Sequence, residues 1–193
     1  MSATVALPGF TDPVGEAQAT FRAVLDAMAR PGRLHRVGAR LTAPAPLDQA
    51  TAAVLLTLVD NETPLWLEPL VAPAGDWLAF HCGASIVDVP GNAGFALALS
   101  LPDLEALSAG SHEAPENSAT LILQIGALGT GTRYRLSGPG LREPTLLAID
   151  GLPADFAAVW QRNHALYPRG VDIILCAGMT LTALPRSVSI EEA

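Results

Sequence analysis

The amino-acid sequence predicts an α/β protein with a mixed β-sheet that helices cover on both faces. Stretches with the 3.6-residue period of a helix alternate with continuous apolar runs of strand length, which is typical of a sheet buried under helices. Late in the chain, short glycine turns join strand-like runs, so the sheet is not purely parallel. The 193 residues contain no long linker, and we expect residues 1–193 to form one domain.

The first predicted element is a helix from about Pro13 to Arg30. Asp12 is placed to cap this helix, and Pro13 suits its first turn. Pro31-Gly32 ends it, and a short strand over 33–37 follows. Apolar residues recur at the helical period and form one stripe along the helix: Val14, Ala17, Phe21, Val24, Leu25 and Met28.

The remaining elements follow from apolar runs and the turn residues between them. A helix over about 48–59 has little polar surface and is expected to be buried. A short helix is expected to begin at Pro102 and to end before Gly110, and a last helix to begin at Pro153. The predicted strands are 65–67, 78–82, 95–99, 120–125 with 133–136 as its hairpin partner, and 171–176 turning into 180–184.

Composition excludes several classes of function. Acidic residues outnumber basic ones 19 to 11, the net charge is −8 and no basic run occurs, so we expect no nucleic-acid partner. No segment approaches about 18 uninterrupted apolar residues, so no membrane span is expected. Two cysteines give no disulfide framework and the first residues lack a secretory signal, which predicts a cytoplasmic protein.

All 11 basic residues are arginine, and the sequence contains no lysine. A Schiff base with pyridoxal phosphate or with a carbonyl substrate therefore cannot form, and a Walker-type phosphate loop lacks its lysine. We expect no cofactor.

The candidate reactive residues, four histidines and two cysteines, have structural explanations. His81 and Cys82 would point to opposite faces of a strand, and His35, His112 and His164 lack ligand spacing, so no metal site is expected. The thiols of Cys82 and Cys176 lie in apolar runs and are expected to be inert.

Two further motifs have a functional and a structural interpretation. The acidic stretch 60–64 could coordinate a cation or accept protons, but turn chemistry also selects these residues, and we favour the turn. Arg133 and Arg135 would share one face of a strand and could hold a phosphate, but a solvated edge strand is favoured. Ser108 resembles the nucleophile of an elbow motif, without its first glycine, and is expected to lie at a helix end.

Several blocks together resemble one known family, the PhnH component of the bacterial carbon–phosphorus lyase system. The blocks occur in one order over nearly the whole chain: Pro13-Val14, Ala17-Gln18, Phe21-Arg22, Ala27-Met28, Pro31-Gly32, 54–58, Asp60-Asn61, Thr63-Pro64, Trp66-Leu67, Phe80-His81, 119–124, Arg135-Leu136, Gly138, Gly140, Tyr167-Pro168, 170–172 and Pro185-Arg186.

The resemblance implies a reduced version of the fold of pyridoxal-phosphate-dependent transferases, without the cofactor. It also implies a homodimer within a complex with carbon–phosphorus lyase subunits G, I and J. That complex forms α-D-ribose 1-methylphosphonate 5-triphosphate from ATP and an alkylphosphonate. A PhnH protein is required for this step in an accessory role, and the resemblance supplies no catalytic residue.

We therefore expect the functional surface to be an interface. The polar residues in matching blocks that we single out are Arg22, Asp60, Asn61, His81 and Arg186. Each also has a structural interpretation: Arg22 could pair with Asp26 four residues on, Asp60 could cap a turn, and His81 could be a satisfied core residue.

Two other functions remain open at this stage. The chain could be a stand-alone nucleotide- or phosphonate-binding transferase, in which Arg133, Arg135 and Arg186 converge on phosphate and Asp60 acts as a base. It could also be a regulatory or assembly scaffold outside phosphonate metabolism.

Overall fold

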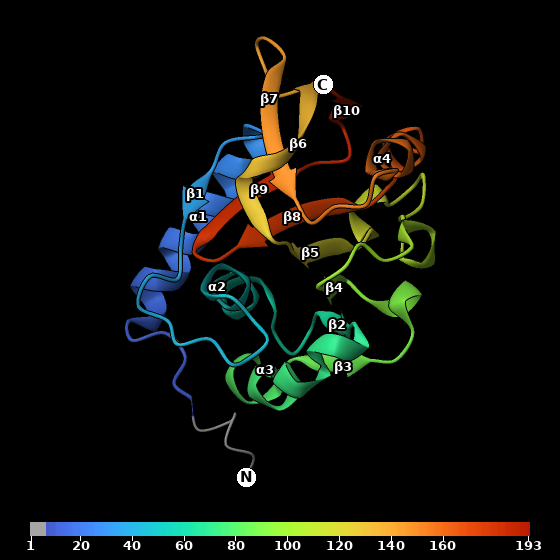
Figure 1. The fold of residues 1–193 in the computed structure, drawn as a ribbon. Helices are drawn as coiled ribbons and strands as arrows, with labels where there is room; N and C mark the ends of the chain where they lie inside the picture. Colours follow the sequence, from blue (N-terminus) through green and yellow to red (C-terminus); the bar gives the residue numbers. More distant parts are fainter. Residues whose placement is uncertain (1–6) are drawn as a thin grey trace.

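The computed structural model describes residues 7–193, and a mixed seven-stranded sheet runs through this part of the chain (Figure 1). The order of the strands is β1-β9-β8-β5-β4-β2-β3, and the run from β8 to β3 is parallel, whereas β9 is antiparallel to both β8 and β1. The strands are β1 (His35–Arg36), β2 (Pro64–Leu67), β3 (Ser85–Val87), β4 (Phe95–Ala98), β5 (Thr120–Gln124), β8 (Asp172–Ala177) and β9 (Thr180–Leu184).

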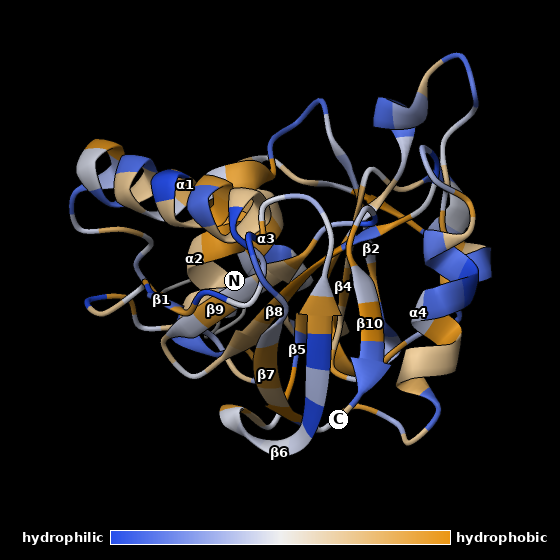
Figure 2. Ribbon diagram, turned by 90° about the horizontal axis from the view of Figure 1, so that it is seen from above, coloured by the Kyte–Doolittle hydropathy of each residue, from blue (hydrophilic) through white to orange (hydrophobic). Residues whose placement is uncertain are grey.

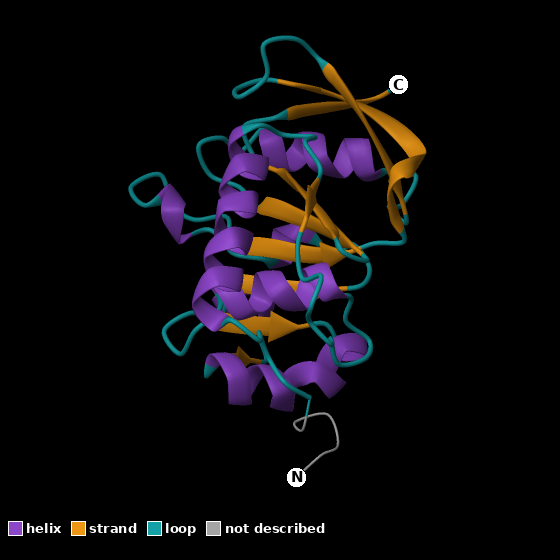
Figure 3. Ribbon diagram, turned by 90° about the vertical axis from the view of Figure 1, so that its left-hand side faces the viewer, coloured by secondary structure: helices purple, strands orange, loops and turns teal. Residues whose placement is uncertain are grey.

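Three helices pack on one face of this sheet: α1 (Pro13–Ala29), α2 (Gln49–Leu58) and α3 (Gly75–Cys82). As predicted, the Asp12 side chain caps α1 by accepting from the Gly15 backbone N–H at 3.1 Å. Residues 50–55 of α2 are all buried, which confirms the expected burial of this helix. Figure 3 shows the helices gathered on this side of the sheet.

The opposite face is covered in a different way. The helix α4 (Phe156–His164) shares it with a second, three-stranded sheet of order β10-β6-β7. The strands of this sheet are β6 (Ala127–Ser137), β7 (Thr145–Asp150) and β10 (Ser189–Glu192). The predicted α/β class and mixed sheet are confirmed, but the cover on this face is mostly sheet rather than helix. Orange strands enclosed between the layers in Figure 2 mark the apolar core.

The predicted strand 78–82 is wrong, because these residues belong to α3. Trp77 and Leu78 are fully buried, whereas Ala79 and Phe80 are exposed, which is the burial pattern of a helix rather than the alternation of a strand. Gly83 ends the helix with a positive φ of 68°, a conformation that glycine adopts without steric cost.

The predicted helix after Pro102 is also wrong and is reduced to one 3-10 turn, Leu104–Ala106. Leu104 and Leu107 anchor the segment in the core, and Ala109 then forms a β-bridge with Ser118 that draws the chain away from a helical path. Other 3-10 turns are Pro69–Ala74, Pro90–Asn92 and Pro115–Asn117. Ser108 therefore does not lie at a helix end.

The predicted pairing of 133–136 with 120–125 does not occur. Both sides of β5 are occupied, by β4 and by β8, so β5 has no free edge. The segment 133–136 lies instead in β6, between β10 and β7. The predicted antiparallel pairing of β8 with β9 is confirmed, with Ile173 opposite Leu184.

The apolar stripe of α1 is only half used by the core. The buried residues of the helix are Thr20, Val24 and Ala27, whereas Val14, Phe21 and Leu25 are 81%, 45% and 52% exposed. At about 100° per residue, the centre of the stripe is turned roughly 80° away from the centre of the buried face. Half of the stripe therefore lies on the molecular surface.

No helix within residues 7–193 combines the length and the apolar character that crossing a bilayer requires.

Candidate functional site

Four of the five residues singled out in the sequence lie along one edge of the large sheet. The parallel strands β2, β3, β4, β5 and β8 all begin at this edge, which we call the strand-start edge. The turn with Asp60 and Asn61 leads into β2, the helix of His81 leads into β3, and Arg186 lies beside the first residue of β8. Arg22 lies instead on the exposed side of α1.

Asp60 builds the turn before β2, as the structural interpretation predicted. Its Oδ1 accepts hydrogen bonds from the backbone N–H groups of Glu62 at 2.9 Å and Thr63 at 3.0 Å, and from the Thr63 hydroxyl at 2.9 Å. These donors, the Glu62 N–H above all, lower the pKa of the Asp60 carboxyl. A carboxylate with a lowered pKa is a weaker proton acceptor, which argues against Asp60 as a general base.

His81 lies in the last turn of α3, and Asn61 lies beside Gly83, which ends this helix. His81 Nε2 is 3.0 Å from the Leu7 carbonyl oxygen, which Trp77 Nε1 also contacts at 3.0 Å. Because a carbonyl only accepts, this contact places the proton on Nε2. Asn61 is exposed, and its Cβ is 3.5 Å from the position that a Cβ would take on Gly83. His81 thus anchors the chain before α1.

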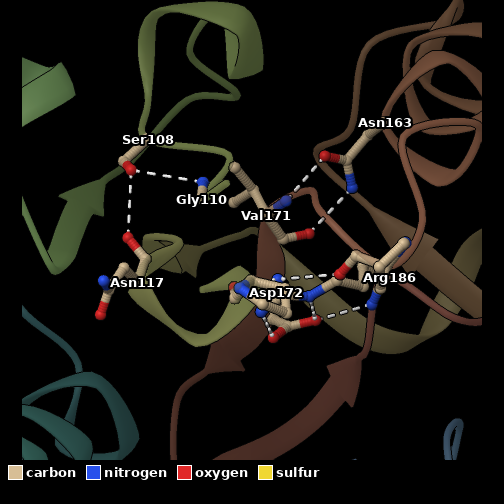
Figure 4. A network of polar contacts seen from close by, with 9 residues as sticks. Ser108, Gly110, Asn117, Asn163, Val171, Asp172 and Arg186 are labelled. Atoms are coloured by element: carbon tan, nitrogen blue, oxygen red, sulfur yellow. Dashed lines mark hydrogen bonds and ion pairs between the residues drawn. The ribbon is translucent and has the colours of Figure 1, made fainter. Parts of the chain in front are cut away.

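The Arg186 guanidinium is held in a largely buried ion pair (Figure 4). Its Nη2 and Nε donate to the two oxygens of Asp172 at 2.5 and 3.1 Å, and its Nη1 donates to the Pro115 carbonyl at 2.9 Å. The Arg186 backbone N–H also donates to Asp172, at 2.7 Å. The two side chains are only 14% and 12% exposed, so the pair joins β8, the segment after β9 and the turn at Pro115.

Two hollows lie side by side at the strand-start edge, and both are lined by Glu116. The first, of about 380 Å³, is lined by Met28, Pro115, Glu116, Tyr167, Pro168, Asp172, Pro185, Arg186 and Ser187. The second, of about 390 Å³, is lined by Thr63, Pro64, 91–95, Ser108, 116–118 and Thr120. Arg186 and Asp172 satisfy one another, so the other polar side chains at the first hollow are those of Glu116, Tyr167 and Ser187.

Buried polar residues that the sequence did not single out shape this edge. The Asn163 side chain bonds both backbone groups of Val171: Nδ2 donates to the carbonyl, and Oδ1 accepts from the N–H, each at 2.8 Å (Figure 4). Ser108 donates to the Asn117 carbonyl at 3.1 Å, so its hydroxyl serves the loop. A lone asparagine inside a helix carries no sequence signal, so Asn163 could not have been found from a motif.

The opposite edge of the sheet, where open α/β sheets bind ligands between diverging strands, is closed by the chain itself. The connections diverge between β2 and β4, and Glu68 spans this point. Its Oε2 accepts from the Leu99 N–H at 2.6 Å, and its Oε1 accepts from the Ser100 hydroxyl at 2.5 Å. Asp48 and Gln124, at the next strands, likewise bond backbone groups of Gly178 and Pro46.

The three arginines of the transferase alternative do not act as one group. Arg133 and Arg135 are exposed on β6 and alternate with the buried Tyr134 and Leu136, as predicted for one strand face. The strand is central in its sheet rather than at an edge, and Arg135 lies opposite Glu191. Arg186 is committed to Asp172 at the strand-start edge.

Arg22 does not form the predicted pair with Asp26. Asp26 is paired with Arg30 and Arg33, and His35 Nε2 lies 3.1 Å from it. Among the residues that the structure describes, Arg22 has no ion-pair partner. No group of three or more His, Cys, Asp or Glu side chains suited to a metal ion occurs in residues 7–193.

Burial raises the pKa of the Cys82 thiol from 9.0 to about 11, and that of Cys176 to about 12. The thiolate is the reactive form, so the rise for Cys82 lowers its reactive fraction about 100-fold near neutral pH. We expect both cysteines to resist iodoacetamide at pH 8 in the folded protein and to react rapidly in 6 M guanidinium. Mass spectrometry after a timed exposure measures this, and fast labelling of the native chain would contradict it.

The matching family covers almost the whole of this structure. The family described as bacterial phosphonate metabolism protein (PhnH) matches residues 8–191, which include the large sheet, both hollows, all five residues singled out above and the second sheet except for the last residue of β10. The chain belongs to the PhnH family. The resemblance stated from the sequence blocks is therefore confirmed.

Two relatives agree with this family. A protein of Rhizobium meliloti strain 1021, described as alpha-D-ribose 1-methylphosphonate 5-triphosphate synthase subunit PhnH, is 39% identical over 187 residues, or 94% of each chain. A Stutzerimonas stutzeri protein, described as putative C-P lyase subunit protein HtxG, is 34% identical over 178 residues, covering 90% of this chain and 85% of the relative. Both descriptions are those of a subunit.

Proposed function

We propose that this chain is an accessory subunit of a carbon–phosphorus lyase assembly, in which it supports the formation of α-D-ribose 1-methylphosphonate 5-triphosphate from ATP and alkylphosphonate. The observation that carries the proposal is the near full-length similarity to a PhnH subunit of the corresponding synthase. The partners are carbon–phosphorus lyase subunits G, I and J, together with a second copy of this chain, in the cytoplasm.

The internal bonding of the polar groups supports an accessory role. Glu68 closes the crevice where a ligand of an open α/β sheet would lie, and Arg186 is neutralised by Asp172. A subunit without a reactive centre of its own acts by stabilising or shaping the site of a neighbour, which binding does by mass action.

The stand-alone transferase is the second candidate, and the geometry weakens it. Its phosphate-binding arginines lie on two separate surfaces, and its base, Asp60, has a lowered pKa. If it held, the isolated chain would bind ATP, and replacing Arg133 and Arg135 by alanine would abolish binding. Isothermal titration with ATP at millimolar concentration measures this directly.

Leaving this chain out of the assembly is expected to abolish product formation. The partners G, I and J are co-expressed with and without it, and conversion of ATP plus methylphosphonate is followed by ³¹P NMR of the product. The isolated chain is the control and is expected to show no turnover. Full activity of the partners without the chain, or turnover by the chain alone, would contradict the accessory role.

We also propose that residues 1–193 act as one unit with the fold of pyridoxal-phosphate-dependent transferases and without the cofactor. The mixed sheet with its single reversed strand β9, within residues 7–193, is the feature to superpose on such an enzyme. The lack of lysine in the sequence supports the loss of the cofactor, because pyridoxal phosphate is bound through a lysine Schiff base.

A further inference from the structure

The exposed stripe of α1 is symmetric about Phe21. Val14 and Met28 lie seven residues to either side of it, and Ala17 and Leu25 lie four residues to either side. These are the spacings at which residues recur on one face of a helix. When two copies of such a helix pack antiparallel about a two-fold axis at Phe21, each apolar residue faces an apolar residue of the other copy.

The charges at the two ends of α1 have the same symmetry with opposite sign. Asp12 precedes Phe21 by nine residues, and Arg30 follows it by nine. Both are exposed. In an antiparallel pair, Asp12 of one copy lies beside Arg30 of the other, and the two helix dipoles are opposed, which is favourable. In a parallel pair the like charges would meet instead.

A hollow lies where the antiparallel pairing of two α1 helices would place the Val14 side chain of the other copy. Val14 is 81% exposed at the start of the helix, and Met28, its counterpart across the axis, lines the 380 Å³ hollow with Tyr167 and Pro168. Tyr167 is itself 61% exposed, so the apolar surface of α1 continues beyond Met28 onto the loop 165–170. A protruding valine fits the side of this hollow that Met28, Tyr167 and Pro168 form.

We propose that α1 is a homodimer interface, in which it packs antiparallel against α1 of a second copy with Phe21 at the two-fold axis and Val14 of each copy at the other's hollow. The inference rests on the homodimer proposed above and names its surface. A different protein would not require a stripe that is symmetric about one residue, nor opposite charges at equal distances from it. A second copy accounts for both, because each residue of an isologous interface meets its symmetry mate.

Changing Leu25 to aspartate is expected to weaken the dimer about 100-fold, because each substitution costs roughly ten-fold and the two-fold axis makes it count twice. The matched control is Leu146→Asp on β7, since Leu146 is 57% exposed and Leu25 is 52% exposed. The control is expected to remain a dimer. Sedimentation equilibrium of the isolated full chain measures both, and circular dichroism checks that each variant is folded.

Cross-linking tests the direction of the pairing. With a short bismaleimide, Phe21→Cys is expected to link to itself, and the double variant Val14→Cys, Met28→Cys to link between copies, whereas Val14→Cys alone does not. The wild-type chain is the blank, which corrects for any link through the native thiols; Cys176 is buried and Cys82 is partly buried. A dimer that survives Leu25→Asp, lacks the link at position 21 or links through Val14→Cys alone overturns the α1 pairing and leaves the homodimer standing. A monomeric wild type overturns both, but leaves the accessory role in the larger assembly untouched.

Discussion

Replacing Arg186 by alanine is expected to lower the free energy of unfolding by about 3–5 kcal/mol, because it leaves the enclosed Asp172 carboxylate without its countercharge. The guanidinium bonds both oxygens of Asp172 and the Pro115 carbonyl, and neither side chain is more than 14% exposed. The variant removes one member of the pair and strands the other, which costs far more than the net contribution of the intact pair. Urea denaturation followed by circular dichroism measures the difference.

The matched control for this prediction is Arg162→Ala. Arg162 pairs with Glu105 at 3.6 Å, but the two side chains are 61% and 75% exposed, so the expected loss is at most about 1 kcal/mol. The double variant Arg186→Ala, Asp172→Ala is expected to be less unstable than Arg186→Ala alone, because no charge is then left buried. If Arg186→Ala unfolds at the same urea concentration as Arg162→Ala, the pair is not a structural element.

This result would assign Arg186 a positioning role rather than a contact with phosphate. The pair ties β8 to the chain after β9 and to the turn at Pro115, and these segments form the first hollow. Loss of the Arg186 side chain would thus affect the α1 dimer interface indirectly, by changing the shape of the first hollow. A defect in dimer formation in Arg186→Ala should therefore follow its loss of stability, and it should be weaker in Arg186→Lys, which keeps the charge.

The sequence predicted the elements whose patterns are unambiguous and missed those whose patterns are not. The hairpin of β8 and β9 was found because two apolar runs flank Ala177-Gly178. The segment 78–82 was assigned to a strand because five residues are too few to reveal a period, and only burial of Trp77 and Leu78 on one side shows the helix. The sequence does not predict the strand β7, since this strand has only six residues and lies between turn residues.

For the site, the sequence predicted Arg186 but not its partner. The signal was present, because Ile173 faces Leu184 in the hairpin, and one more step brings Asp172 to the start of the segment that holds Arg186. The stripe on α1 was also predicted from its period, but a period cannot say which part of a stripe the core uses. That depends on how the helix is rotated on the sheet, and here the rotation leaves Phe21 and Leu25 outside.

The second large effect is expected at Asn163. Changing it to alanine removes the partners of both the N–H and the carbonyl of Val171 inside the core, and each unsatisfied group costs about 1–3 kcal/mol, so the free energy of unfolding should fall by about 2–6 kcal/mol. Asn163 is only 5% exposed, so water cannot readily replace its amide. Gln161→Ala, an exposed position on the same helix, is the control and should change little.

The Asn163 variant also separates global from local stability. The asparagine fixes the end of the loop 165–170, whose Tyr167 and Pro168 line the first hollow. Hydrogen exchange should therefore accelerate at 165–171 by more than the global loss explains, while β5 retains its relative protection. An equal acceleration of hydrogen exchange in the loop and in β5 would show that Asn163 stabilises the whole core and does not specifically order the loop at the hollow. Faster exchange confined to the loop would show that the buried Asn163 amide fixes the shape of the first hollow, where we place Val14 of the second copy.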